Sequence, residues 1–255
     1  MIRILCFAVL TVFLVPQWAD AAKKEPVTEK IVFIPHDNRP ISSKQTADVV
    51  QRTGYEVVVP PTELLGSRDD WGHPEELWTW VEENLAQPGV KAAVISSDAM
   101  IYGSLVGSRK HAYTRSQVLA RAQRFDGLQR TCPKVPLYVF GSIMRTPRTG
   151  EASGHEEPEY YRRYGADIFR YTVLRDKEEI EGLTRRERKE YDFLGRLIPK
   201  EALDDWMGRR EKNYVVNEYL IDLLRKRNTF RYLTLGRDDN APFSQTHLES
   251  RHLTE

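Results

Sequence analysis

The sequence has little cysteine, no excess of either charge and only one long hydrophobic run. Lys and Arg number 38 against 37 Asp and Glu, so the formal net charge is +1. A nucleic-acid-binding protein usually carries a basic excess, so we expect no nucleic acid as partner. Of the two cysteines, Cys6 lies in the hydrophobic run and Cys132 stands alone further on. A mature chain without Cys6 would have no internal disulfide, and we expect Cys132 to be a buried structural thiol.

The motifs of several large enzyme classes are missing. The chain has no G-x-G-x-x-G fingerprint and no P-loop, so nucleotide binding is not indicated. It has no H-E-x-x-H or C-x-x-C pattern, and no G-x-S-x-G turn of a serine hydrolase. We therefore expect no cofactor and no bound metal.

The one hydrophobic run stands at the N-terminus. Positively charged Arg3 precedes an apolar stretch over 4–15, and Ala19 and Ala21 supply small residues at the positions preceding a cleavage site. This pattern predicts a signal peptide over 1–21 and export to the periplasm or beyond the cell. The run is short for a membrane anchor, and no second one follows, so we expect no membrane span after cleavage.

The rest of the chain alternates between strand and helix patterns. Short apolar runs rich in β-branched residues predict strands over 30–34, 55–59, 92–96, 136–140 and 231–235. Helical spacing predicts helices over 42–53, 74–86 and 114–131. The order indicates an α/β fold with a parallel sheet and crossover helices, either an open sheet or an incomplete (β/α) barrel. We divide it into an α/β core over 22–150, a charged helical insertion over 151–230, and a fifth strand over 231–255 that returns to the core.

Polar side chains follow four of the predicted strands. Ligands of α/β proteins bind beyond the carboxyl ends of the strands, so we expect a small-molecule or carbohydrate pocket there. The candidate binding residues are Asp37, Arg39, Asp98, Tyr102, Arg109, Arg145, Arg237 and Asn240.

Two adjacent carboxylates, Asp238 and Asp239, follow the last predicted strand. Neighbouring carboxylates repel each other, which can separate their pKa values and leave one as acid and one as base. Glycosidases that act on 2-acetamido sugars also use an Asp-Asp pair at a strand end. The alternative is a turn or a helix cap, where Asp is favoured for local reasons.

Two further patterns lie outside these loops. Arg209, Asn213 and Asn217 recur at i, i+4 and i+8, which predicts a solvent-exposed polar stripe, or ligands if that face turns toward the strand ends. Trp78 is expected in the core, whereas Trp71 could stack on a sugar ring.

Five separated motifs resemble one bacterial family. They are I-P-H-D-N-R-P from Ile34, V-P-P-x-x-L-L-G from Val59, S-D-A-M-x-Y-G-S-L-V-x-S-R from Ser97, I-M-R from Ile143 and L-G-R-D-D-N-A-P from Leu235. In this order they resemble the domain of unknown function 4127, whose name implies no activity. Members read Asp-Asp-Arg-Pro where this chain has Asp37-Asn38-Arg39-Pro40, and they are longer, which implies later strands that this chain lacks.

The sequence favours an exported carbohydrate-active hydrolase, with Asp239 as general acid and Asp238 as orienting carboxylate. Three alternatives stay open: a non-catalytic exported ligand-binding protein, a truncated inactive relative, and a metal-dependent hydrolase that uses His36, Asp37 and Asp98. Nothing in the sequence indicates the oligomeric state.

Overall fold

The computed structural model describes residues 28–150, 155–239 and 241–255. The predicted signal peptide and Asn240 lie outside these residues. The strands are β1 (Lys30–Ile34), β2 (Glu56–Val58), β3 (Val90–Ser96), β4 (Leu137–Ile143) and β5 (Tyr232–Arg237). The helices are α1 (Lys44–Gln51), η1 (Thr62–Leu64, a turn of 3-10 helix), α2 (Pro74–Leu85), α3 (Ser97–Tyr102), α4 (Leu105–Lys110), α5 (Arg115–Thr131), α6 (Tyr161–Ile180), α7 (Arg185–Leu197), α8 (Lys200–Arg227) and α9 (Gln245–Thr254).

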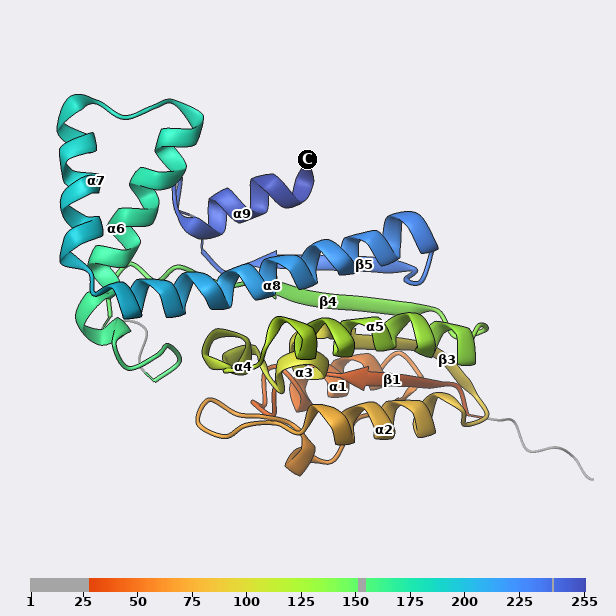
Figure 1. Ribbon diagram of the computed structural model, residues 1–255. Helices are drawn as coiled ribbons and strands as arrows, with labels where there is room; N and C mark the ends of the chain where they lie inside the picture. The colour runs from red at the N-terminus through yellow and green to blue at the C-terminus, as the bar shows by residue number, and fades with distance from the viewer. Residues whose placement is uncertain (1–27, 151–154, 240) are drawn as a thin grey trace, which may run out of the picture.

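All five strands form one parallel sheet in the order β2-β1-β3-β4-β5 (Figure 1). The predicted α/β class with a parallel sheet and crossover helices is confirmed. Two sheet arrangements were left open by the sequence. In a (β/α) barrel each strand pairs with its neighbours in the chain, whereas here β1 separates β2 from β3, which is the order of an open sheet wound in both directions.

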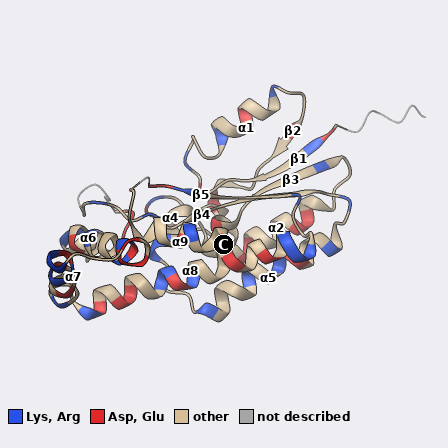
Figure 2. Cartoon of the chain, turned by 90° about the horizontal axis from the view of Figure 1, so that it is seen from above, with Lys and Arg blue, Asp and Glu red and all other residues tan. Residues whose placement is uncertain are grey.

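Helices cover the two faces of the sheet unequally. On one face α1 packs over β1 and β2, where Ala47 contacts Phe33 and Val57. On the other face α2, α5 and α8 form the main core with the strands (Figure 2). Because each β1 residue points to the opposite face from the next, Phe33 belongs to the small cluster, and Ile34 to the large one.

Helix α2 shows how local sequence fixes the core. Pro74 occupies the first turn, where the missing N–H costs nothing, and two glutamates follow it near the positive end of the helix dipole. Trp78 is fully buried, and its indole N–H donates to the carbonyl oxygen of Met100 at 3.0 Å. Its ring forms a T-shaped pair with the Phe125 ring, with centroids 4.8 Å apart. The polar end and the apolar body of the side chain are thus both satisfied.

The charged helices carry a second apolar cluster. Tyr161 and Ile168 of α6 pack with Leu194 of α7 and with the buried Trp206 of α8. Ion pairs link side chains on the outer surfaces of these helices, such as Arg170 with Glu190 at 2.8 Å. Bands of both charges alternate along α7 and α8 (Figure 2). Further along, α8 places Val216, Leu220 and Leu223 in the main core, so one helix joins both clusters.

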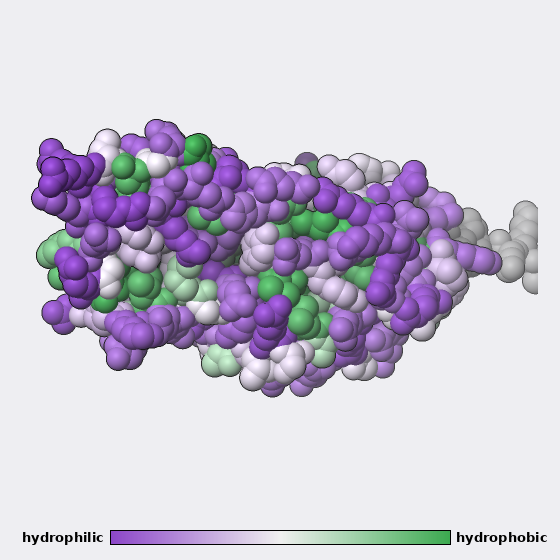
Figure 3. Space-filling view, turned by 45° about the horizontal axis from the view of Figure 1, so that its top comes forward, coloured by the Kyte–Doolittle hydropathy of each residue, from purple (hydrophilic) through white to green (hydrophobic). Residues whose placement is uncertain are grey.

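No helix among the described residues is long and apolar enough to cross a membrane. Hydrophilic side chains cover most of the face in Figure 3, and the hydrophobic ones form separate patches. Cys132 is only half-buried, because it follows the last residue of α5 at the rim of the core, so the expectation of a buried thiol was wrong.

Candidate functional site

The carboxyl ends of the strands meet at a point where the chain reverses direction. After β1 the chain passes through α1 to β2 on one side, and after β2 it crosses back to β3 on the other. The segments that leave β1 and β3 therefore diverge to opposite faces of the sheet. Such a switch point is where open α/β sheets bind their ligands.

Three arginines from three different strand ends converge on one glutamate there. Arg39 follows β1, Arg109 lies on α4 beyond β3, and Arg145 follows β4. Their guanidinium nitrogens lie 3.5 Å, 2.8 Å and 3.1 Å, in that order, from the carboxylate oxygens of Glu156. We call Arg39, Arg109, Arg145 and Glu156 the arginine cradle. Planar guanidinium groups in such numbers are typical of sites that bind carboxylate or phosphate groups.

Arg39 is held by an aspartate two residues before it. Asp37 is fully buried and accepts hydrogen bonds from the Arg39 side-chain Nε at 2.9 Å and the Arg39 backbone N–H at 3.2 Å. The hydrogen bond to Asp37 is the main cause of a raised pKa for Arg39, and burial acts against it. Arg39 keeps 37% of its side chain exposed, so the cradle is open to solvent on this side.

Arg109 is the buried member of the cradle. Its helix α4 begins at Ser104, whose hydroxyl accepts from the Gly107 N–H at 2.8 Å. Only 3% of the Arg109 side chain is exposed, and its second partner is Asp238, 3.0 Å away. The Asp238 side chain is 51% exposed, so the carboxylate that pairs with the buried Arg109 lies at the protein surface.

The two adjacent aspartates have different partners. Asp238 points to Arg109, whereas Asp239 is ringed by donors: the Thr146 N–H at 3.0 Å, the Ser244 hydroxyl at 3.3 Å and the Ala241 N–H at 3.4 Å. These contacts tie the end of β5 to the segment after β4 and to the start of α9. Asp239 therefore acts in this structure as an acceptor, and its bond to the Ala241 N–H two residues on is a turn contact.

A neighbouring glutamate lies in a different environment. Glu157 is 4% exposed, and its Oε1 accepts from the Arg145 Nε at 2.9 Å. Burial raises the pKa of Glu157, although three arginines nearby oppose this effect. The residue lines a cavity of about 330 Å³ together with Lys110, His155, Glu159 and Arg162. This volume is at the lower end of the range of small-molecule sites.

His36 and Asp98 meet at the switch point itself. The His36 Nδ1 lies 3.2 Å from an Asp98 carboxylate oxygen and 3.0 Å from the Ser96 hydroxyl. The imidazole forms a T-shaped pair with the Phe140 ring, with centroids 4.7 Å apart. Asp98 and the Tyr102 hydroxyl are buried within α3, and burial raises the pKa of Tyr102. Among the described residues no group of three or more His, Cys, Asp or Glu side chains could hold a metal ion.

The polar stripe of α8 is buried. Arg209, Asn213 and Asn217 are each 5% or 6% exposed, so the predicted solvent-exposed stripe was wrong. The reason is that this face of α8 turns toward the strand ends, the alternative that the sequence left open. There the Asn213 side chain donates to the Ser108 carbonyl at 2.7 Å, and Asn217 donates to the Ser142 carbonyl at 3.2 Å. Their amides support the backbone beneath the cradle.

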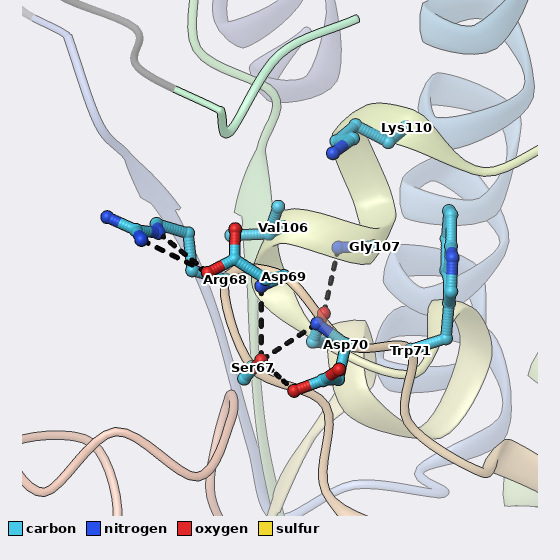
Figure 4. A pocket seen from close by; sticks show the side chains of 9 residues that line it. Ser67, Arg68, Asp69, Asp70, Trp71, Val106, Gly107 and Lys110 are labelled. Carbon is cyan, nitrogen blue, oxygen red and sulfur yellow. Dashed lines mark hydrogen bonds and ion pairs between the residues drawn. The ribbon is translucent and has the colours of Figure 1, made fainter.

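A small pocket opens on the other side of α4 (Figure 4). It holds about 20 Å³, room for about one water molecule. Ser67, Asp70, Gly107 and Lys110 line it, and the Trp71 side chain, 52% exposed, flanks it. A sugar ring does not fit inside, so only the outer face of Trp71 offers a stacking surface.

One known protein family matches the chain. The family model described as a protein of unknown function, DUF4127, matches residues 31–255. The chain belongs to this family. No curated protein and no solved structure matches it. The family assignment therefore confirms the resemblance carried by the five motifs, and leaves the activity to be argued from the site.

In this DUF4127 protein several predicted site residues lie together. Asp37, Arg39, Arg109, Arg145 and Asp238 are joined by the contacts of the cradle. Arg237 is the exposed last residue of β5, and no contact described here joins it to the cradle. Asn240 lies outside the described residues.

Sequence reasoning missed the two glutamates at the centre. Glu156 and Glu157 fall in the predicted charged helical insertion over 151–230, and neither was a candidate site residue. A usable signal was present, because an adjacent acidic pair follows a strand end that carries Arg145. Three arginines after three strands need acidic counterparts, and this pair supplies them.

Proposed function

We propose that this protein is an exported carbohydrate-active hydrolase whose substrate carries an acidic group. The observation that carries the proposal is the convergence of Arg39, Arg109 and Arg145 on one carboxylate at the switch point of the sheet. Glu156 occupies the cradle as an acidic ligand would, and the rim at Arg39 and Asp238 is open to solvent. A uronic acid or another anionic sugar would bind by replacing Glu156 against the three guanidinium groups.

The cavity beside Glu157 supports the same proposal. At about 330 Å³ it accommodates a single sugar ring rather than a polymer segment. Its walls carry cationic Lys110 and Arg162 next to acidic Glu157 and Glu159. A few convergent polar groups of both signs in a concave site are what an orienting sugar pocket needs.

Calorimetric titration of the purified protein tests the binding. We expect glucuronate to bind and glucose, which lacks the carboxylate, to bind at least tenfold more weakly. Arg109→Met should abolish glucuronate binding, because methionine has neither the charge nor the hydrogen-bond donors of the buried guanidinium. Arg170→Met is the matched control, because Arg170 pairs with Glu190 on the surface of α6 and α7. Equal affinity for the two sugars would contradict the proposal.

Hydrolysis is measured on nitrophenyl glucuronide and nitrophenyl glucoside. Release of nitrophenol from the glucuronide alone is the expected result. Saturable glucuronate binding without release would identify a non-catalytic exported binding protein instead. Export is tested separately, by fractionating cells that express the full chain with a C-terminal tag; recovery of the tagged protein only from the cytoplasm would contradict it.

A further inference from the structure

Each arginine of the cradle has an acidic partner of its own in addition to the shared Glu156. These pairs are Arg39 with Asp37 at 2.7 Å, Arg109 with Asp238 at 3.0 Å and Arg145 with Glu157 at 2.9 Å. A buried guanidinium that loses its last acidic partner destabilises a protein strongly. Here no guanidinium of the cradle would lose its last one if the Glu156 carboxylate moved away.

The Glu156 side chain can move while its neighbours stay in place. Glu156 lies in a bend shortly before α6, and 19% of its side chain is exposed, so solvent borders it. On one side the His155 carbonyl oxygen accepts from the Lys110 Nζ at 3.0 Å. On the other side the buried Glu157 accepts from the Arg145 Nε at 2.9 Å. Rotation of one side chain therefore vacates the cradle, and neither of these anchoring contacts has to break.

Resting on the proposed function, we propose that Glu156 is an internal competitor of the substrate carboxylate and sets the affinity of the cradle. In the free protein its carboxylate holds the place between the three guanidinium groups. A ligand carboxylate takes that place when the Glu156 side chain turns outward. One carboxylate replaces another, so the charge beside the arginines is unchanged and their N–H groups keep acceptors.

This competition selects ligands that bind through more than their charge. A ligand gains only the difference between its own contacts and those that Glu156 gives up. A bare carboxylate such as acetate makes the same contacts with the arginines as Glu156 does, and it gains little. A sugar acid adds contacts from its ring, and it gains more.

Competition and a purely structural role predict opposite effects of the same substitution. If Glu156 only aligns the arginines, Glu156→Gln loosens them and weakens the binding of a carboxylate. If Glu156 competes, the substitution removes the competing charge and strengthens that binding. The apparent affinity of a site falls in proportion to the fraction of molecules in which the site is vacant, so a cradle that is vacant in about one molecule in ten gains about tenfold.

Calorimetric titration with glucuronate measures the sign. We expect Glu156→Gln to bind glucuronate about tenfold more tightly than wild type. Glu190→Gln, the same change in the exposed pair with Arg170, should bind like wild type. The melting temperature of Glu156→Gln without ligand should stay close to that of wild type, because each arginine keeps its own acid. Equal or weaker binding overturns the role of Glu156, and so does a Glu156→Gln chain that fails to fold while Glu190→Gln folds.

Acetate tests the role of Glu156 apart from the carbohydrate. If glucuronate binds neither wild type nor Glu156→Gln, the proposed function fails, and thermal unfolding in acetate then decides on Glu156 alone. Acetate should stabilise Glu156→Gln more than wild type. Equal stabilisation of the two proteins, or none of either, overturns the competition as well. Glucuronate binding of equal strength in the two proteins leaves the proposed function standing and overturns the competition alone.

Discussion

The buried ion pair between Arg210 and Glu249 should be one of the most costly places to mutate in this protein. Arg210 on α8 is 1% exposed, and its Nε and Nη2 reach the two oxygens of Glu249 on α9 at 2.8 Å and 2.7 Å. The same guanidinium donates to the carbonyl oxygens of Met144 at 2.6 Å and Arg145 at 2.9 Å. Its plane lies over the Trp206 ring, 4.6 Å from the centroid. One side chain therefore joins α8, α9 and the backbone that carries the cradle.

Replacing Arg210 by Met keeps the volume and removes every donor. Glu249 would then be a buried charge without its cation, and removal of one partner of a buried pair costs about 3–5 kcal/mol. For a chain of this size, a loss of about 4 kcal/mol lowers the melting temperature by about 8–16 °C. Adding Glu249→Leu removes the stranded charge, so the double variant should regain most of the loss.

Urea unfolding of the two single variants, the double variant and wild type completes the cycle. Arg170→Met is again the control, because the Arg170–Glu190 pair has the same charges but is 42% and 38% exposed. An exposed pair contributes below about 1 kcal/mol. If Arg210→Met costs no more than Arg170→Met, the reasoning from burial is refuted. If the double variant is no more stable than Arg210→Met, the loss does not come from the uncompensated glutamate.

Three further outcomes follow from single contacts. Gly72→Ala should cost about 1–3 kcal/mol in urea unfolding, because its Cβ would lie 2.1 Å from a backbone oxygen. Gly208→Ala within α8 should gain about 1 kcal/mol, since the added Cβ would meet nothing beyond its own helix backbone within 4 Å. The reverse order of stabilities contradicts this packing. Burial lowers the pKa of His111 to about 4. As the pH falls from 6.5 to 4, the unfolded chain therefore takes up a proton before the folded protein does, and the free energy of unfolding decreases by at most about 3 kcal/mol. His111→Gln should flatten this pH profile of stability, and an unchanged slope is the contrary result. Trp78→Phe should cost about 1–3 kcal/mol in the same assay, because the Met100 carbonyl at 3.0 Å loses its donor; a neutral effect would mean that this bond contributes nothing.

Local pattern was sufficient to predict most of the scaffold. Short apolar runs bounded by turn residues located all five strands of the sheet, with ends within a few residues of those observed. The signals were strong because a parallel sheet covered by helices leaves its strands almost wholly apolar. The order of the strands in the sheet was not predictable in the same way, because it depends on which face of the sheet each crossover helix covers. No residue pattern in β1 or β3 indicates that face.

The three arginines of the site were predictable, as were Asp37 and Asp238, whereas Glu156 and Glu157 were not. Arg39 and Arg145 follow predicted strands within a few residues, and Arg109 lies on the second of two short helices after another strand, so the topology brings them to one edge. Glu156 is distant from two of them in the chain and lies in a loop without periodicity. Its position depends on contacts with arginines from distant parts of the chain. Long-range charge pairing of this kind leaves only a weak local trace, which here is the acidic pair that follows the strand end with Arg145.

The charged helix α8 therefore has a role beyond forming a hydrophilic surface. Asn213 and Asn217 of α8 donate to carbonyls next to the strand ends, and Arg210 holds the backbone at Arg145. A helix face that buries a guanidinium and two amides needs acceptors, and the last turn of α4 and the end of β4 supply carbonyl oxygens. The polar face of α8 and the carboxyl edge of the sheet thus satisfy each other. The cradle arginines stand on that interface, so we expect mutations along α8 to change ligand affinity as well as stability.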